Sequence, residues 1–259
     1  MQKVSFIGSG KVAWHLAKAL HQKGFQIGEI YSRSTQNAQL LAQEVAAKVN
    51  TNLDFTSQSP DLLLVAVSDN ALAEVVGNLK IGKQTIVAHT SGSIGLEVFR
   101  KANYPYAVFY PLQTFSKNRN LDFSKIPICL EANNEEIYIF LEKIAHKLSA
   151  NVSRISSAQR KVLHIAAVFA CNFVNHLLAI SKNILDKEQL SFDLLKPLIQ
   201  ETITKALEAK HPKEVQTGPA VRGDNLVLQK HIAYLAENLQ MQKLYKLLSE
   251  SIQHFDEEK

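Results

Sequence analysis

A polar stripe in the second half of the chain carries residue types that can move a proton. At 100° per residue, Lys161, His164, Val168, Asn172 and Asn175 fall within about 80° of one another on a helix. When a hydride is added to the carbon of a carbonyl or imine, a proton donor must supply a proton to the oxygen or nitrogen. An imidazole can do this because it titrates near neutral pH. We therefore expect His164 to act as acid or base, with Lys161 as the second candidate. Asn172 and Asn175 are expected to orient the substrate.

The positions beside this stripe are apolar, so we expect the helix to be buried and its polar groups to need partners. These apolar positions include Ile165, Phe169, Phe173 and Leu177. A substrate can be such a partner, which favours an active-site lining. The other interpretation is that His164, Asn172 and Asn175 bind one another or the backbone and tie helices together. Both interpretations stay open.

A second motif lies at the start of the chain, where residues 8–13 read GSGKVA between a strand and a helix. In this GxGxxA pattern the first glycine permits a tight turn, and the second lets the backbone approach a pyrophosphate. The free N–H groups and the positive dipole end of the helix attract the phosphates. We expect a dinucleotide to be bound by Gly8, Ser9, Gly10, Lys11 and Val12.

The end of the second strand discriminates between the two nicotinamide dinucleotides. An acidic residue there binds the ribose 2′-hydroxyl of NAD, whereas basic or hydroxylated residues suit the 2′-phosphate of NADP. Here the strand ends in Ser32, Arg33 and Ser34, while Glu29 lies inside it and is expected to point away. We predict NADP, with NAD the less favoured cofactor. The alternative for Arg33 is an ordinary surface arginine.

Loops after the other strands should lie beside the cofactor, because ligands collect at the carboxyl ends of parallel strands. The cofactor-side candidates are Val67, Ser68, Asp69, His89 and Ser91. Asp69 is equally suited to cap the helix that follows it. The loop after residue 110 adds Gln113 and Thr114 as substrate candidates.

A loop rich in glycine and proline, residues 216–224, supplies two more candidates for substrate binding. Thr217 carries a hydroxyl, and Arg222 can clamp a carboxylate or phosphate with two hydrogen bonds. Pairing of Arg222 with Asp224 of the same loop is an equal alternative. We also expect Asp224 to cap a helix that begins at Asn225.

Two kinds of periodicity divide the chain into two domains. Up to about residue 155, short apolar runs alternate with helical periods, which is typical of a parallel sheet covered by helices. The expected strands are residues 4–7, 25–31, 62–67, 85–89, 106–110 and 126–130. After Ser156 only helical segments follow, at residues 158–183, 192–209, 225–238 and 241–255. We predict an α/β Rossmann-like domain with a mostly parallel sheet over residues 1–155, and an all-α domain over 156–259.

Composition argues against several classes of protein. The chain has 259 residues, 46% of them hydrophobic, and a formal net charge of +5. Its Lys and Arg residues are scattered among Glu and Asp, so we expect no nucleic-acid partner. Cys129 and Cys171 stand apart, which predicts neither a disulfide framework nor a metal site. Without a signal peptide, and with Asn172 and His176 interrupting the longest apolar run, we expect a cytoplasmic protein outside the membrane.

Several of these motifs together resemble a known superfamily. The turn at residues 8–10, the strand end at 32–34, AVSD at 66–69 and HTSG at 89–92 resemble the pyrroline-carboxylate reductase, deazaflavin-dependent NADP reductase and β-hydroxyacid dehydrogenase superfamily. More narrowly, the chain resembles a bacterial family of Rossmann-like proteins with a helical C-terminal domain of unassigned function. That narrower resemblance is carried by YPLQTF at 110–115, the helix at 164–172, TGP at 217–219 and RGD at 222–224. It implies an NADP-binding fold and a homodimer formed through the helical domain.

Tyr110 is the one departure from the family pattern, since many members have histidine before the Pro-Leu-Gln stretch. Our principal prediction is an NADP-dependent oxidoreductase that transfers a hydride between the nicotinamide and a small carbonyl, imine or hydroxy-acid substrate in an interdomain cleft. The alternative is a non-catalytic NADP-binding sensor or scaffold, and the missing histidine keeps this alternative open. A nucleic-acid-binding regulator would need a basic helical domain, and scattered Glu residues dilute its charge.

Overall fold

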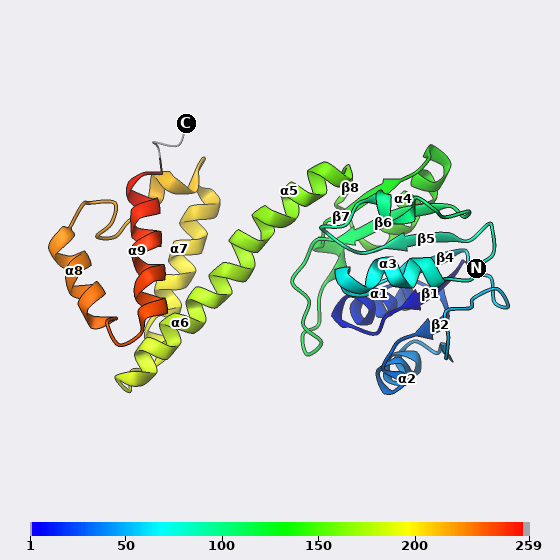
Figure 1. Ribbon diagram of the computed structural model, residues 1–259, viewed down its shortest axis with the longest axis horizontal. Helices are drawn as coiled ribbons and strands as arrows, with labels where there is room; N and C mark the ends of the chain where they lie inside the picture. The colour runs from blue at the N-terminus through cyan, green and yellow to red at the C-terminus, as the bar shows by residue number, and fades with distance from the viewer. Residues whose placement is uncertain (1, 256–259) are drawn as a thin grey trace. The chain divides into compact units, whose positions relative to one another are not determined.

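A sheet in which all but one pair of neighbouring strands is parallel organises the first half of the chain. The computed structural model describes residues 2–255. The sheet runs in the order β3-β2-β1-β4-β5-β6-β7-β8, and only β6 and β7 pair antiparallel (Figure 1). Its strands are β1 (Lys3–Ile7), β2 (Gln26–Tyr31), β3 (Lys48–Asn50), β4 (Leu62–Val65), β5 (Ile86–His89), β6 (Tyr106–Pro111), β7 (Ile128–Ala132) and β8 (Val152–Arg154). The predicted fold class is confirmed, whereas β3 and β8 are too short to give a clear sequence signal.

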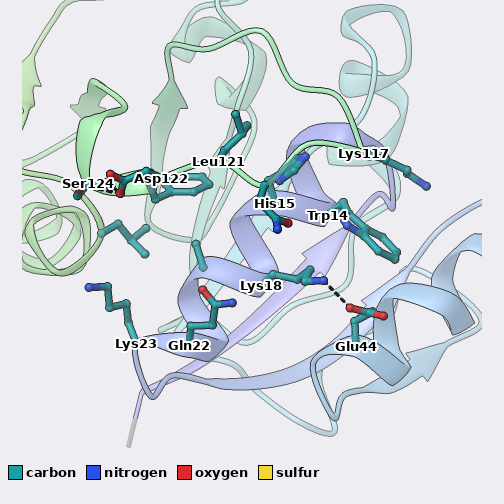
Figure 2. Close-up of a pocket in the computed structure, with 14 residues that line it drawn as sticks. Trp14, His15, Lys18, Gln22, Lys23, Glu44, Lys117, Leu121, Asp122 and Ser124 are labelled. Atoms are coloured by element: carbon teal, nitrogen blue, oxygen red, sulfur yellow. Dashed lines mark hydrogen bonds and ion pairs between the residues drawn. The ribbon is translucent and has the colours of Figure 1, made fainter.

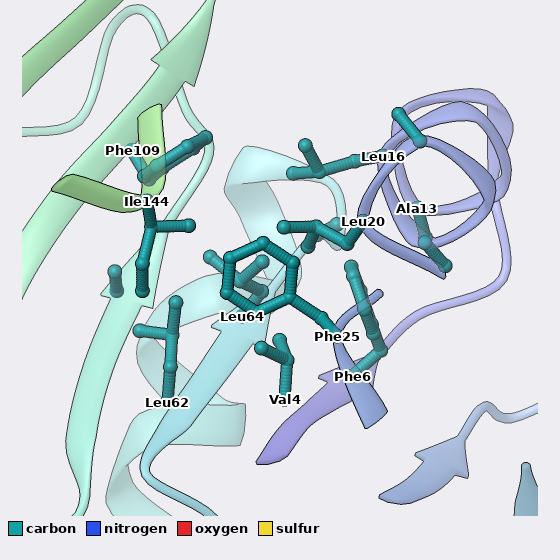
Figure 3. Packing of buried hydrophobic residues seen from close by; sticks show 14 of the residues in the cluster. Val4, Phe6, Ala13, Leu16, Leu20, Phe25, Leu62, Leu64, Phe109 and Ile144 are labelled. Atoms are coloured by element: carbon teal, nitrogen blue, oxygen red, sulfur yellow. The ribbon is translucent and has the colours of Figure 1, made fainter. Parts of the chain in front are cut away.

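Helices cover both faces of this sheet, because alternate residues of each strand point to opposite faces. One core joins the strand residues Val4, Phe6, Leu62 and Leu64 to α1 (Lys11–Gln22), α2 (Thr35–Glu44) and α4 (Glu135–Leu148). Figure 3 shows Leu16 and Leu20 of α1 over these strand residues. The other core lies under α3 (Asp69–Asn78) and the 3-10 turn η1 (Leu96–Phe99), and contains Ile7, Leu63, Val65 and Val87. Burial on both faces accounts for the continuous apolar runs in the sequence.

A continuous helix follows β8 and is longer than predicted. It consists of α5 (Ser157–Ala167), a π-helical turn η3 (Val168–Phe173) and α6 (Val174–Lys187). A capping box fixes its start, because Ser156 Oγ accepts from the Gln159 amide and Gln159 Oε1 accepts from the Ser156 amide. The π-helical turn changes the angle between successive residues, so the predicted stripe at 100° per residue does not continue across it.

The expectation that this helix is buried is wrong for the described chain. Ile165 is 59% exposed, Phe169 is 65% exposed and Phe173 is 47% exposed. Asn172 and His176 interrupt the apolar run but not the helix, which continues through both residues as the predicted helical segment 158–183 does. By length and composition, Ser157–Lys187 is the one helix within residues 2–255 that could cross a membrane, a test that core helices of soluble proteins also pass. Apolar residues at helical spacing indicate that one face of a helix is packed against something. They do not show whether the packing partner belongs to the same chain or to another.

Two compact units divide the chain inside the long helix, at Met1–His176 and Leu177–Lys259. The division lies after the predicted boundary near residue 155. In the second unit the described residues form helices and turns without a strand: the remainder of α6, η4 (Phe192–Leu194), α7 (Lys196–Glu208), η5 (Pro212–Val215), α8 (Asn225–Tyr234) and α9 (Leu239–Gln253). A hydrogen bond of 2.7 Å between His231 Nδ1 and Tyr245 Oη joins α8 to α9.

Candidate cofactor and proton-donor site

The turn after β1 is held by the backbone of Gly8. Its φ of +108° is a left-handed value that side chains disfavour, and a Cβ there would lie 2.2 Å from the Ala66 carbonyl oxygen. The Gly8 amide donates to the Tyr31 carbonyl at 2.7 Å, so the turn is tied to the end of β2. The β1, β2 and β4 ends are therefore drawn together, and only glycine fits between them.

Gly10 has a different role, at the start of α1. It is the N-cap residue, its side chain position faces open space, and the first turn of α1 contains no acidic residue. The first amide of the helix that finds an intrahelical partner is that of Trp14, which donates to the Gly10 carbonyl. The preceding amides remain available to an anion such as a pyrophosphate. Lys11 is exposed beside them, whereas the Val12 side chain packs against the core and can offer only its backbone.

We predict that alanine at these two glycines changes different properties: stability at Gly8 and NADPH affinity at Gly10. Gly8→Ala should lower the free energy of unfolding by about 3 kcal/mol, because the methyl group meets backbone in a left-handed conformation. Gly10→Ala should melt like the wild type yet bind NADPH at least about tenfold more weakly, because the methyl group occupies the path of the pyrophosphate. Thermal melts and fluorescence titrations measure both. Wild-type affinity in Gly10→Ala would place the pyrophosphate elsewhere.

The end of β2 presents the group expected to bind a 2′-phosphate. Ser9 Oγ donates to Ser32 Oγ at 2.8 Å, which joins the phosphate turn to this strand end. Ser34 caps α2 by accepting from the Asn37 amide, and Arg33 is exposed beside it. Glu29 lies inside the strand, where its carboxylate accepts from the Asn50 side chain at 3.3 Å. The strand end therefore offers hydroxyls, one cation and a helix N-terminus.

A pocket of about 550 Å³ runs from the Gly8 turn along α3. Ser9, Ser32, Arg33, Val67 and Ser68 line it, as predicted from the loops at the strand ends. The sequence reasoning missed its apolar wall, which is formed by Leu53, Ala71 and Val75. Such a wall suits the face of a purine ring. The periodicity of α3 could have identified Ala71 and Val75, whereas Leu53 follows the unrecognised strand β3.

Three other residues predicted beside the cofactor are engaged elsewhere. His89 is fully buried, stacks on Phe99 at 5.6 Å and accepts from the Ser91 amide through Nδ1. Burial and the nearby Arg160 lower the pKa of His89 to about 4, so it is neutral at physiological pH. Ser91 Oγ accepts from the amides of its own turn, and Asp69 accepts from the Ser93 hydroxyl. The N-cap position of α3 belongs to Ser68 instead of Asp69.

The most direct chemical pair joins β6 to α5. Tyr110 Oη lies 3.2 Å from His164 Nδ1, and the two rings meet edge to face. Both pack on Gly92, where a Cβ would lie 2.7 Å from His164 Nδ1 and 2.9 Å from Tyr110 Cζ. Burial raises the pKa of the Tyr110 phenol, so it keeps its proton across the physiological range. Tyr110 is thus part of the candidate site.

A buried ion pair fixes α5 one helical turn before His164. Arg160, which is 1% exposed, donates to Glu131 Oε2 at 2.6 Å and to the Ile94 carbonyl at 2.7 Å. The Ser157 amide and hydroxyl donate to the same Glu131 carboxylate. Arg160 thereby connects α5 to β7 and to the turn that contains Gly92. Arg160 was not identified from the sequence, although a cation within an apolar helical segment is a sign of a buried, paired charge.

The rest of the predicted polar stripe does not converge on this pair. Lys161 forms an exposed ion pair with Glu97 at 3.5 Å. Asn172 and Asn175 are exposed, and neither side chain hydrogen-bonds to another of the described residues. Asn172 lies about 12 Å along the helix from His164, at the usual rise of about 1.5 Å per residue. Of the stripe, only His164 contacts Tyr110.

The remaining substrate candidates either bond to a neighbouring residue in the sequence or lie in the second unit. Gln113 Oε1 accepts from the amide of Thr114, and both residues are exposed. In the second unit Arg222 binds Asp224 through Nε at 3.0 Å and Nη2 at 2.8 Å, the alternative considered from the sequence. Asp224 is the N-cap residue of α8 but makes no side-chain cap. Thr217 is exposed. Within residues 2–255 no group of three or more His, Cys, Asp or Glu side chains is arranged to hold a metal ion.

This fold and this turn define a dinucleotide-binding protein of the Rossmann type. Residues 1–108 match the model of a Rossmann-like domain, and residues 126–252 match that of a domain of unknown function, DUF2520. A structure from Bacteroides fragilis, described as a "putative NADP oxidoreductase", is 44% identical over 98% of both chains, with a TM-score of 0.92. The chain belongs to the same family as the Bacteroides fragilis protein, and this confirms the resemblance drawn from its motifs.

More distant structures share the fold. A protein from Thermotoga maritima is 26% identical over 98% of both chains, with a TM-score of 0.71. An imine reductase from Myxococcus stipitatus in complex with NADP+ is 15% identical, covering 97% of this chain and 93% of its own, with a TM-score of 0.68. Among curated proteins none matches the chain.

Proposed function

We propose that this protein, an NADP-dependent oxidoreductase, reduces a small carbonyl or imine, or oxidises the corresponding hydroxy compound. The observation that carries the proposal is the Tyr110–His164 pair, with 3.2 Å between Oη and Nδ1. Carbonyl and imine reduction both need a proton donor beside the hydride acceptor. A phenol held by an imidazole supplies one.

The pair lies at the same edge of the sheet as the phosphate turn. β1, β4, β5 and β6 are parallel neighbours, so their carboxyl ends meet along one edge. Gly8 follows β1, Gly92 follows β5, and Tyr110 is the next-to-last residue of β6. Bound ligands collect at this edge in sheets of this type. A dinucleotide whose pyrophosphate binds the Gly8 turn can therefore extend its nicotinamide toward Tyr110.

The chain's own residues manage the proton in this scheme. NADPH, when bound, supplies the hydride. His164 Nδ1 donates its hydrogen to Tyr110 Oη, which leaves the phenol hydrogen directed away from the imidazole and toward the substrate. When the substrate oxygen or nitrogen gains negative charge, Tyr110 transfers this proton to it, and the His164 hydrogen bond stabilises the phenolate that remains. Arg160 holds α5 in place and acts as a positioning residue.

A substrate screen tests the proposal directly. The purified chain is mixed with NADPH, and keto acids, cyclic imines and aldehydes are assayed for loss of the reduced cofactor. Turnover of at least one class is expected. Tight NADPH binding without turnover of any class would contradict catalysis and support the sensor or scaffold alternative.

The exposed apolar residues of the long helix support a second proposal, that two copies of the chain form a homodimer. Val162, Ile165, Phe169 and Phe173 are exposed apolar side chains of this helix, and the ring centroids of Phe169 and Phe173 lie 5.0 Å apart. Such faces mark interaction surfaces, and homodimers are the commonest way to cover them. We expect Phe169→Lys to convert a dimer to a monomer in light scattering, with Leu40→Lys, a change at an exposed leucine of α2, leaving it dimeric. A monomeric wild type would contradict this proposal.

A further inference from the structure

The loop between β6 and the 3-10 turn η2 (Phe123–Lys125) is fixed against α1. His15 of α1 bonds through Nε2 to the Ser116 carbonyl at 2.9 Å and stacks on Phe115 at 5.5 Å. Phe115 in turn stacks on Phe123, whose side chain is buried in the first core. The residues after Ser116 are therefore held at a defined place beside the start of α1.

Lys117 is a cation of this loop that lacks a carboxylate partner among residues 2–255. Its Nζ lies 5.0 Å from the centre of the Trp14 ring. Lys18 lies over the same ring at 5.4 Å, but it is paired with Glu44 at 2.5 Å (Figure 2). An ammonium held only by an aromatic face is weakly bound, and a nearby anion can recruit it.

A cavity of about 490 Å³ brings this loop together with the candidate phosphate site. It is lined by Ser9, Gly10 and Lys11 of the turn after β1, and by Ser32, Arg33 and Ser34 at the end of β2. Asn37, Ser116, Lys117 and Asn118 complete the lining. Three of its lining residues are cations and none is acidic, so the site suits a ligand with more negative charge than a pyrophosphate alone.

We propose that Ser116, Lys117 and Asn118 form one side of the cofactor's adenosine phosphate site, and that Lys117 makes the chain select NADPH over NADH. The inference rests on the proposed function, because it assigns the extra anion to the 2′-phosphate. Arg33 and Lys117 bind this phosphate from two elements that are far apart in the sequence. The hydroxyl of Ser116 and the amide of Asn118 add donors beside the charge.

The test compares two lysines that lie over the same tryptophan. Lys117→Gln removes the charge that borders the cavity, whereas Lys18→Gln removes one that does not line it. We expect Lys117→Gln to raise the Kd of NADPH about tenfold and to change that of NADH less than about twofold. Lys18→Gln should leave both constants unchanged. The tenfold effect should shrink as salt is added, because the loop is exposed.

Each alternative result has a distinct meaning. If Lys117→Gln leaves NADPH affinity unchanged, or weakens NADPH and NADH equally, the inference is overturned while the proposed function stands. If Lys18→Gln causes the same loss of selectivity as Lys117→Gln, the effect is general surface charge and the inference is also overturned. If the wild type binds neither dinucleotide, the proposed function itself fails. Both lysines lie on the surface, and a melting curve for each variant verifies that it folds.

Discussion

Tyr110→Phe is expected to lower kcat by about 100-fold and to leave the Kd of NADPH unchanged. The substitution keeps the ring that packs on Gly92 and removes only the hydroxyl that lies 3.2 Å from His164. Stopped-flow measurement of NADPH oxidation gives kcat, and a fluorescence titration gives Kd. A loss confined to kcat would place the phenol in the transition state instead of in cofactor binding.

Tyr106→Phe is the matched control for this prediction, because it makes the same chemical change on the same strand. The Tyr106 ring stacks on Phe99 at 5.2 Å in the second core, away from His164. We expect its kcat to stay within about twofold of the wild type. Equal losses in the two variants would mean that β6 is disturbed generally, and undiminished activity in Tyr110→Phe would remove Tyr110 from the mechanism.

The pH dependence follows from the direction of the Tyr110 shift. Burial raises the pKa of this phenol above its ordinary value of 10.0, so the protonated form that donates is present below that pH and is lost only above it. Tyr110 should therefore impose no fall in kcat between pH 7 and about pH 10. A tyrosine-dependent fall in kcat that begins near pH 8 would contradict the assignment.

The parts of the site that sequence could predict are those in which contacts are local. The Gly8 turn, the free start of α1 and the end of β2 are each marked by a motif of a few consecutive residues, although Gly8 also contacts the distant Ala66. Tyr110 and His164 are 54 residues apart, and Arg160 and Ile94 are 66 apart. Their contacts depend on how α5 packs against the sheet, which periodicity does not reveal.

Two incorrect expectations have simple physical causes. His89 lies two residues after Val87 on β5, so it points to the same face and enters the second core beside Phe99. The alternation of side chains along a strand is sufficient to predict this orientation of His89. The burial expected for the long helix failed for another reason, because an apolar stripe does not distinguish an intramolecular core from a surface that another chain covers.

A large effect on stability is also expected at the buried ion pair. Arg160→Met should lower the free energy of unfolding by about 3 kcal/mol, because it leaves the Glu131 carboxylate without its cation and the Ile94 carbonyl without its donor. Trp14 is the sole tryptophan of the chain and lies on α1, so its fluorescence in urea reports on the nucleotide-binding domain. The same variant should also lose kcat, because α5 carries His164.

Arg154→Met is the control, since it removes an arginine from an ion pair of similar length on the surface. Arg154 and Glu135 lie 2.5 Å apart with side chains 53% and 66% exposed, so solvent screens the pair and its loss should destabilise the protein much less than Arg160→Met. Adding Glu131→Leu to Arg160→Met removes the stranded charge and should recover part of the stability. If the two arginine variants unfold at the same urea concentration, Arg160 does not hold α5 to the sheet. If the double variant regains stability without activity, the pair serves to position His164 and is not required for folding.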